Sequence, residues 1–266
     1  MPISDYRPPV AQLLALGDPL VDPDEISYRQ LGLSEADVPE LCRLAQATSL
    51  DDDEADDLEV YACVHAWRAL GELRAEAAID TLIGEFRHAE MDDWVAEELP
   101  AILGRIGATA IAPLTAYLED DDNDTWARVT AMTSLTAIAQ AFPESRDRCG
   151  AILSEQLTRF AEQDADFNAL LIGGLATLAA VEAAPLMEQA FAAEAVDLTV
   201  MGDWEDVRIE LGLLQRRLTP RPNYYGYSLP TPGESAPTLR KSAAGKAKKV
   251  KRKQQAKSRQ RNRKKK

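Results

Sequence analysis

A leucine recurs along this chain at intervals that each suit one helical hairpin. Leu70, Leu103, Leu135, Leu175 and Leu213 are separated by 33, 32, 40 and 38 residues. Each lies in a stretch of small and aliphatic residues. Self-similarity at a period of about 20 to 50 residues is the signature of stacked supersecondary units. The spacing therefore predicts an array of similar units.

An aromatic residue marks the start of each unit. The aromatic residues are Tyr61, Trp94, Trp126, Phe167 and Trp204, nine residues before the leucine or, for Phe167, eight. An aspartate stands one or two residues before four of them, at positions 93, 124, 166 and 203. Aspartate is a favoured helix N-cap because its carboxylate accepts hydrogen bonds from the first free backbone N–H groups. We therefore predict that each aspartate begins a helix and that the aromatic residue in its first turn packs against the preceding unit.

A second, shorter amphipathic segment follows each of the first four leucines. These segments cover residues 76–88, 109–118, 144–161 and 182–193. The expected unit is helix, tight turn, helix. Such a pair cannot bury its apolar stripe alone, so neighbouring pairs should stack into an α-solenoid. We expect the fifth unit to be a single capping helix over residues 203–218.

The repeat units resemble HEAT repeats of the short type found in phycobilisome-lyase (PBS lyase) proteins. That type favours Ala-x-Ala-Leu-Gly-x-x-Gly followed by an Ala-Ile pair, which Leu103-Gly-Arg-Ile-Gly107 and Ala110-Ile111 match. The order of landmarks, such as His65-Ala-Trp-Arg-Ala-Leu-Gly71 and Gly202-Asp-Trp-Glu-Asp-Val207, also resembles a bacterial group of HEAT-like proteins of unassigned function. The resemblance covers roughly residues 41–218. It implies an all-α, HEAT-like α-solenoid (an α-α superhelix) that binds partners along a concave face lined by the second helices; it implies no chemistry.

Four segments are expected on this basis. Residues 1–58 should form an N-terminal helical cap, with one short helix over 10–16 and another that a capping box at Ser34 to Asp37 opens. Residues 59–218 should form the HEAT-like solenoid, and 219–239 a Pro- and Tyr-rich linker with Tyr224, Tyr225 and Tyr227 docked on the last helix. Residues 240–266 have almost nothing apolar to bury, so we expect a disordered basic tail.

Charge is divided unequally between these segments. Residues 1–239 contain 15 arginines, no lysine and 44 acidic residues, a formal charge of −29, whereas 240–266 carry +15. An acidic body disfavours nucleic acid and favours a basic protein partner, while Lys/Arg clusters bind phosphate by counterion release. The tail could also fold back on the acidic body. The expected polyanion-binding residues are Lys248, Lys249, Lys251, Arg252, Lys253, Arg261, Arg263, Lys264, Lys265 and Lys266.

Catalytic and cofactor motifs are missing from the sequence. It contains no HExxH, GxSxG, P-loop or GxGxxG pattern,. Cys42, Cys63 and Cys149 are scattered and form no CxxC pair, so we expect core cysteines, no disulfide and no metal site. His65, beside Trp67, should line the core or a groove. No secretory signal or span of roughly 20 apolar residues is found, so a cytoplasmic protein without membrane contact is expected.

The expected function is therefore binding. The first reading is a noncatalytic scaffold or adaptor for a protein partner, with no cofactor. The second is an RNA- or ribosome-associated factor whose basic tail binds polyanions, and the third is a lyase-type chaperone for a prosthetic group. The sequence identifies neither the partner nor the oligomeric state.

Overall fold

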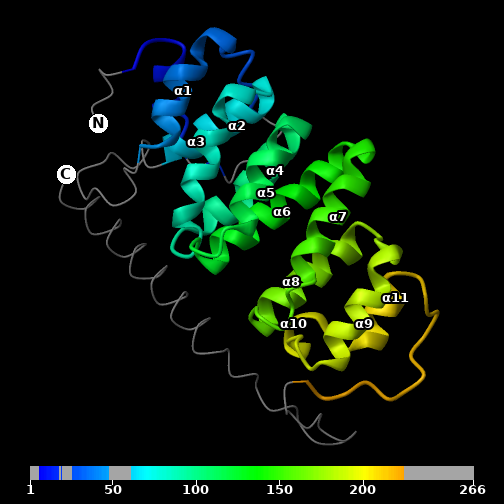
Figure 1. Cartoon of the computed structure of the whole chain (residues 1–266). Helices are drawn as coiled ribbons and strands as arrows, with labels where there is room; N and C mark the ends of the chain where they lie inside the picture. The colour runs from blue at the N-terminus through cyan, green and yellow to red at the C-terminus, as the bar shows by residue number, and fades with distance from the viewer. Residues whose placement is uncertain (1–5, 18, 20–25, 48–60, 225–266) are drawn as a thin grey trace, which may run out of the picture. The chain divides into compact units, whose positions relative to one another are not determined.

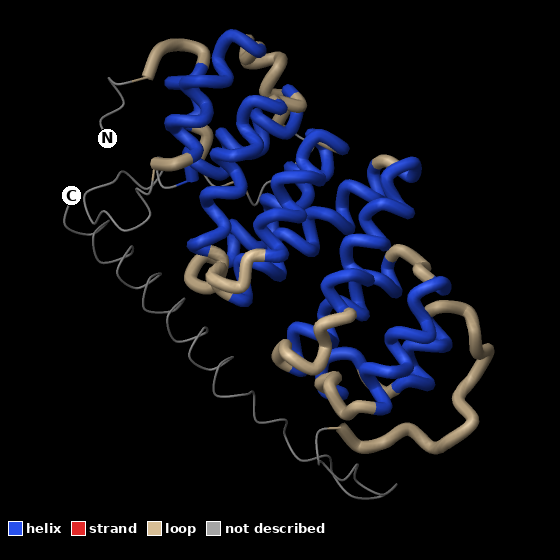
Figure 2. Tube along the Cα trace, viewed as in Figure 1, coloured by secondary structure: helices blue, strands red, loops and turns tan. Residues whose placement is uncertain are grey.

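The structure, a computed structural model, describes residues 6–17, 19, 26–47 and 61–224. Within these residues all regular secondary structure is helical, which confirms the predicted all-α class. Figure 1 shows the helices in chain order, and Figure 2 shows the loops that join them. The described residues belong to one compact unit that ends at Tyr224.

Four helical hairpins follow one another from Ala62 to Ala192. The first helices of the hairpins are α2 (Ala62–Leu73), α4 (Asp93–Ile106), α6 (Thr125–Ala141) and α8 (Ala165–Thr177). Each contains one of the first four recurring leucines, and all four leucines are buried. α2 packs against α4, α4 against α6, and α6 against α8. The leucine spacing therefore located the four first helices correctly.

The α-helical part of each second helix is shorter than the first helix of its hairpin, and it follows a 3₁₀ turn. They are η6 (Glu76–Ala78) with α3 (Ile79–Gly84) and η7 (Glu85–His88), η8 (Ala108–Ala110) with α5 (Ile111–Glu119), η9 (Pro143–Ser145) with α7 (Arg146–Leu157), and η10 (Val181–Ala183) with α9 (Ala184–Ala192). Each lies within a few residues of its predicted segment. α7 ends at Leu157, before the predicted end at residue 161.

Glycines allow the first helices to approach closely. A Cβ added to Gly71 of α2 would lie 3.2 Å from Cγ2 of Ile102 in α4, and one added to Gly104 of α4 would lie 3.1 Å from Cβ of Ala137 in α6. These distances are shorter than ordinary van der Waals contact, so a larger residue would push neighbouring helices apart. The glycine after the recurring leucine in the first two hairpins is therefore a packing residue.

The turn inside the second hairpin requires glycine for two reasons. Gly107 has a φ of +102°, a conformation that other residues rarely adopt,. A Cβ at this position would also lie 2.9 Å from Cε2 of Phe142, whose ring covers the turn.

The N-terminal segment packs on the first hairpin. η2 (Val10–Ala15) contacts α2, and α1 (Val38–Ala45) packs against α2 and α3. The predicted capping box is present in η3 (Glu35–Asp37), where the Ser34 N–H donates to Asp37 Oδ2 at 2.8 Å.

A buried polar network joins this segment to α2 and α4. The Tyr28 hydroxyl lies 2.9 Å from His65 Nδ1, and His65 Nε2 lies 2.9 Å from the Gly17 carbonyl oxygen. Because a carbonyl only accepts, Nε2 donates, and in the neutral ring Nδ1 accepts from Tyr28. Burial raises the pKa of Tyr28 to about 12, which keeps its hydroxyl protonated as this donor. His65 is fully buried, which confirms the predicted core role.

The last part of the described chain differs from the sequence prediction. An unpredicted short helix, α10 (Leu198–Met201), follows the fourth hairpin, and α11 (Trp204–Glu210) ends eight residues before the expected position 218. Gly212 has a φ of +73°, and the chain then reverses so that Arg217 donates to both carboxylate oxygens of Asp203, at 2.8 and 2.6 Å. Leu213, the last of the recurring leucines, lies beyond the end of α11 and is 50% exposed.

Within the described residues, no single helix combines the length and the apolar content that crossing a membrane requires. Among these residues, one pair of consecutive helical segments, α4 and η8–α5, has enough length and apolar content when the two are taken together, but the chain bends by 115° between them.

Candidate partner-binding site

The connections between hairpins lie next to one another along one edge of the helical stack. We call this the inter-hairpin edge and define it as residues 89–92, 120–124, 158–164 and 193–197, with the first turn of the helix that follows each. At its N-terminal end, the rings of Tyr61 and Trp94 are 5.9 Å apart and those of Phe86 and Tyr117 are 5.5 Å apart. The first contact joins the start of the first hairpin to the start of the second, and the second contact joins the ends of the same two hairpins.

Similar contacts continue the edge through the later hairpins. Arg159, after α7, pairs with Asp121 in the preceding connection. The Arg128 guanidinium at the start of α6 lies 4.8 Å from the centre of the Phe167 ring at the start of α8. The Asp197 N–H donates to the Ala165 carbonyl oxygen at 2.9 Å. Successive connections are therefore neighbours in space.

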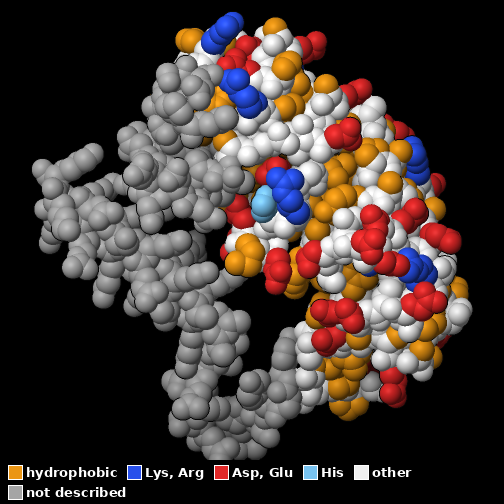
Figure 3. All heavy atoms as spheres, turned by 60° about the vertical axis from the view of Figure 1, so that its left-hand side comes forward, with side chains coloured by type: hydrophobic (Ala, Val, Ile, Leu, Met, Phe, Trp, Pro, Cys, Tyr) orange, Lys and Arg blue, Asp and Glu red, His pale blue; other side chains and the backbone are white. Residues whose placement is uncertain are grey.

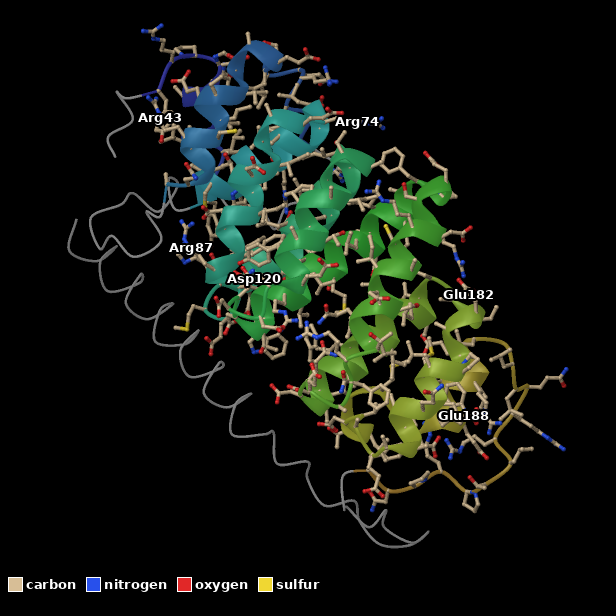
Figure 4. The ribbon with its side chains drawn as sticks, in the orientation of Figure 1. Arg43, Arg74, Arg87, Asp120, Glu182 and Glu188 are labelled. Carbon is tan, nitrogen blue, oxygen red and sulfur yellow. The ribbon has the colours of Figure 1, made fainter. Side chains whose placement is uncertain are left out.

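The turns inside the hairpins form the opposite edge. The Arg74 guanidinium lies 5.9 Å from the centre of the Phe142 ring, and Arg146 donates to the carbonyl oxygens of Leu178 and Ala179 at 3.0 and 2.8 Å. Figure 4 shows Arg87 and Asp120 on one side of the stack and Arg74 and Glu182 on the other. The connections between hairpins and the turns inside hairpins therefore lie on opposite sides of the helical stack.

Capping explains only some of the acidic residues of the inter-hairpin edge. Carboxylates of Asp92, Asp124, Asp197 and Asp203 accept hydrogen bonds from the first turns of α4, α6, α10 and α11. The predicted caps at Asp93 and Asp166 were wrong: the caps lie at Asp92 and Asp164, because the helices begin earlier than the aromatic position suggested.

Other acidic side chains in the same connections are exposed and do not cap. The carboxylates of Glu90, Asp122 and Glu194 have no hydrogen-bond or ion-pair partner in the described part of the chain. Asp121 differs, because a hydrogen bond from Arg159, with a smaller contribution from Arg128, lowers its pKa below the ordinary value. The edge thus carries negative charge beyond what its helices use.

Large apolar side chains are exposed in these same acidic connections. Among the described residues, seven large apolar side chains are exposed, and four lie on this edge: Met91 (80%), Trp126 (49%), Leu198 and Val200. The predicted packing of the aromatic residue against the preceding unit is found for Trp94, which contacts the Tyr61 ring, and for Phe167, which contacts Arg128, but Trp126 is half exposed. Figure 3 shows one face of the molecule, on which red acidic and orange apolar side chains alternate.

The outward faces of the second helices expose fewer large apolar side chains than the inter-hairpin edge does. Their exposed positions include Ala112 and Ala116 of α5, Ala151 of α7 and Ala192 of α9. Charged side chains such as Glu155 and Glu188 are exposed on these helices too, but Val181, in η10, is the only exposed large apolar side chain of the described second helices. That the second helices carry the partner site remains a prediction, whereas the inter-hairpin edge combines charge with large apolar side chains.

No catalytic or metal site emerges from the described residues. No group of three His, Cys, Asp or Glu side chains in this part of the chain could hold a metal ion. His88 accepts a hydrogen bond from Arg87 Nε at 3.0 Å. Cys63 and Cys149 are buried, as predicted, and Cys42 is half-buried. The ten predicted polyanion-binding residues, Lys248 to Lys266, lie outside the described residues.

Comparison with known proteins gives one family. No curated protein and no solved structure matches the chain. The model of one family, described as Protein of unknown function (DUF1186), matches residues 34–217, from the capping box before α1 to the arginine that pairs with Asp203. The chain belongs to the DUF1186 family.

Proposed function

We propose that this protein is a noncatalytic, cytoplasmic scaffold or adaptor, built as a HEAT-like α-solenoid, that binds a basic protein partner. The observation that carries the proposal is the inter-hairpin edge, where exposed Met91 and Trp126 lie among carboxylates that no cap uses. Tryptophan is enriched among residues that dominate binding energy. Exposed apolar side chains with a charged surround are typical of interaction surfaces.

The helical arrangement supports the HEAT-like part of the proposal. Four hairpins of similar length pack in chain order through their first helices. In such arrays each unit contacts mainly its neighbours, so the connections on each edge form a long, regular surface.

The proposal is tested by affinity isolation with the full chain, from extract of the cells that produce it, with and without nuclease treatment. We expect one basic protein, retained in stoichiometric amount after nuclease treatment and released by salt, because electrostatic attraction is screened within about 10 Å at 0.1 M salt. Retention of nucleic acid alone, with no protein left after nuclease treatment, would refute the scaffold function.

A second candidate function follows from the charge of the C-terminal residues. We propose as the alternative that Arg240–Lys266, with 15 basic and no acidic residues, binds RNA or another polyanion. The test is binding of single-stranded RNA across a salt series, by the full chain and by a chain ending at Leu239. Tight, salt-sensitive binding that is lost on truncation supports this role. Equal binding by both chains, or none by the full chain at moderate salt, rejects it.

A further inference from the structure

The two ends of the helical array are covered differently. At the first end, η2 and α1 pack on the first hairpin, and the described residues between 6 and 47 expose no large apolar side chain. At the other end, α11 packs on α9 of the fourth hairpin, and the residues after it include Leu213 and Leu218, which are 50% and 71% exposed. The last unit of a repeat array needs a polar outer face to keep the chain soluble. The surface of α11 and residues 211–218, which we call the terminal face, departs from this pattern.

The exposed leucines of the terminal face are held against α11 through their backbone. The Leu213 N–H donates to the Arg208 carbonyl oxygen at 2.8 Å, near the end of the helix. The Leu218 N–H donates to Glu205 Oε2 at 3.0 Å, in the first turn of the helix. Between the two leucines, Arg217 forms ion pairs with the start of α11. The backbone of both leucines is therefore ordered before any contact forms, which lowers the entropy cost of binding a partner.

The charge balance of the terminal face favours a second copy of the same chain as that partner. Residues 203–224 contain four acidic and four basic residues and have no net formal charge. Residues 61–197, which form the four hairpins and their connections, contain 24 acidic and 8 basic residues, a formal charge of −16. The hairpin surfaces of two copies therefore repel each other, whereas the terminal faces do not.

Three charged side chains of the terminal face, Arg208, Glu210 and Arg216, have no ion-pair partner within the described part of the chain. The Nε atom of Arg208 is also buried without a hydrogen-bond partner there. In a twofold contact the same surface of both copies meets, so that residue i of one copy contacts residue j of the other and j contacts i. Unpaired charges of both signs within nine residues can therefore pair with those of a second copy.

We propose that two copies of this chain associate through the terminal face as a twofold symmetric dimer. The contact buries Leu213 and Leu218 of both copies, and Glu210 of each copy pairs with an arginine of the other. This inference is independent of the proposed function, because the inter-hairpin edge is not part of the contact.

Sedimentation equilibrium of the full chain tests the leucines. From about 1 to 100 µM protein, a range that covers weak and moderate dissociation constants, we expect an equilibrium between monomer and dimer. Leu213→Ser combined with Leu218→Ser should raise the dissociation constant at least about 10-fold, because four leucine side chains per dimer lose their burial. Met91→Ser is the matched control, since Met91 is 80% exposed on the inter-hairpin edge, and it should leave the constant unchanged. A parent chain that stays monomeric, species larger than a dimer, or equal effects of the two variants would overturn the inference.

A charge exchange tests the twofold symmetry. Glu210→Arg leaves only positive charge among the unpaired groups of the face and should weaken the dimer about 10-fold, because like charges then meet across the contact. Adding Arg216→Glu exchanges the two charges and should restore most of the affinity; both side chains are exposed, so folding should not change. A double variant no tighter than Glu210→Arg alone would refute the symmetric pairing. A dimer of the parent chain that disappears at 1 M salt, where charges are screened within about 3 Å, would show that the leucines do not hold it and would also overturn the inference.

Discussion

Arg68 is almost fully buried in α2, and its charge is matched by Glu98 of α4. The guanidinium donates to both carboxylate oxygens, at 2.9 and 2.6 Å, and to the Pro19 carbonyl oxygen at 2.9 Å. Three segments, the N-terminal segment and the first two hairpins, therefore meet at one side chain. Removing Arg68 therefore takes away a hydrogen-bond donor from both carboxylate oxygens of Glu98 and from the Pro19 carbonyl oxygen.

We expect Arg68→Met to lower the free energy of unfolding by about 3 kcal/mol, since breaking one partner of a buried pair leaves an uncompensated charge. Arg68→Met combined with Glu98→Leu should recover part of that loss, because no charge is then stranded. Urea denaturation of the single and double variants measures both effects. A double variant whose loss equals the sum of the single losses would contradict this account of the pair.

Gly107 and Gly150 should respond in opposite ways to the same substitution. Gly107→Ala places a Cβ against the Phe142 ring at a positive φ, and such strain costs about 1 to 3 kcal/mol,. Gly150, inside α7, has no atom within 4 Å of an added Cβ, so Gly150→Ala should stabilise by about 0.5 to 1 kcal/mol. Thermal unfolding of the two variants tests this, and equal stability of Gly107→Ala and the parent protein would show that the turn is not constrained as described.

At the scale of elements, α11 holds the segment that follows it through charge. Arg217 pairs with Asp203 and Asp206, and the Tyr224 hydroxyl donates to Asp206 Oδ2 at 2.8 Å. The hydrogen bonds from Arg217 lower the pKa of Asp203 below its ordinary value. Burial tends to raise the pKa of Asp206, but its bonds to Arg221 and Arg217 outweigh this and hold the pKa well below the usual range.

Acid should therefore release residues 217–224 from α11. A carboxylate whose pKa is lowered in the folded state contributes stability that is complete above its unfolded pKa of about 4 and is lost as the pH falls through the folded pKa. The N–H groups of Leu218 and Thr219 donate to Glu205 Oε2 at 3.0 and 3.1 Å. Hydrogen exchange of these two amides, corrected for the intrinsic rate at each pH, should show protection at pH 7 that is lost progressively below pH 4.

The matched variants for this segment are Arg217→Gln and Arg216→Gln. The first removes the ion pairs and should lower protection of the Leu218 and Thr219 amides already at pH 7, whereas Arg216, which is exposed, should be replaceable without effect. Equal protection in both variants would mean that apolar contacts, not the carboxylates, hold the segment.

The sequence predicted the hairpins well because their signals are local. Each of Leu70, Leu103, Leu135 and Leu175 is buried at the position its spacing required. The final unit departed from prediction because Gly212 adopts a left-handed φ, and because Arg217 pairs with Asp203 fourteen residues earlier. Neither the reversal nor this ion pair has a periodic signal that could be read from residues 203–218.

The candidate site was harder to predict because it depends on which members of a repeated pattern are exposed. Trp94 and Trp126 occupy the same offset, yet Trp94 contacts the Tyr61 ring while Trp126 is 49% exposed. The aspartates at positions 93 and 124 were read as caps, which holds for Asp124, whereas the cap of α4 is Asp92. Asp122, in the same connection as Asp124, is exposed and caps no helix. The three-dimensional structure is needed to tell which carboxylates cap a helix and which are exposed and available to a partner.

In the whole molecule, we propose that the inter-hairpin edge contacts a basic segment of a protein partner. The most direct measurement is photo-crosslinking in cells with a photoreactive phenylalanine analogue in place of Trp126 or, in a separate variant, of Ala116 on the exposed face of α5. We expect a cross-link from position 126 to a Lys/Arg-rich peptide of one protein, and little or none from position 116. Cross-links from position 116 alone, or from neither position, would contradict it.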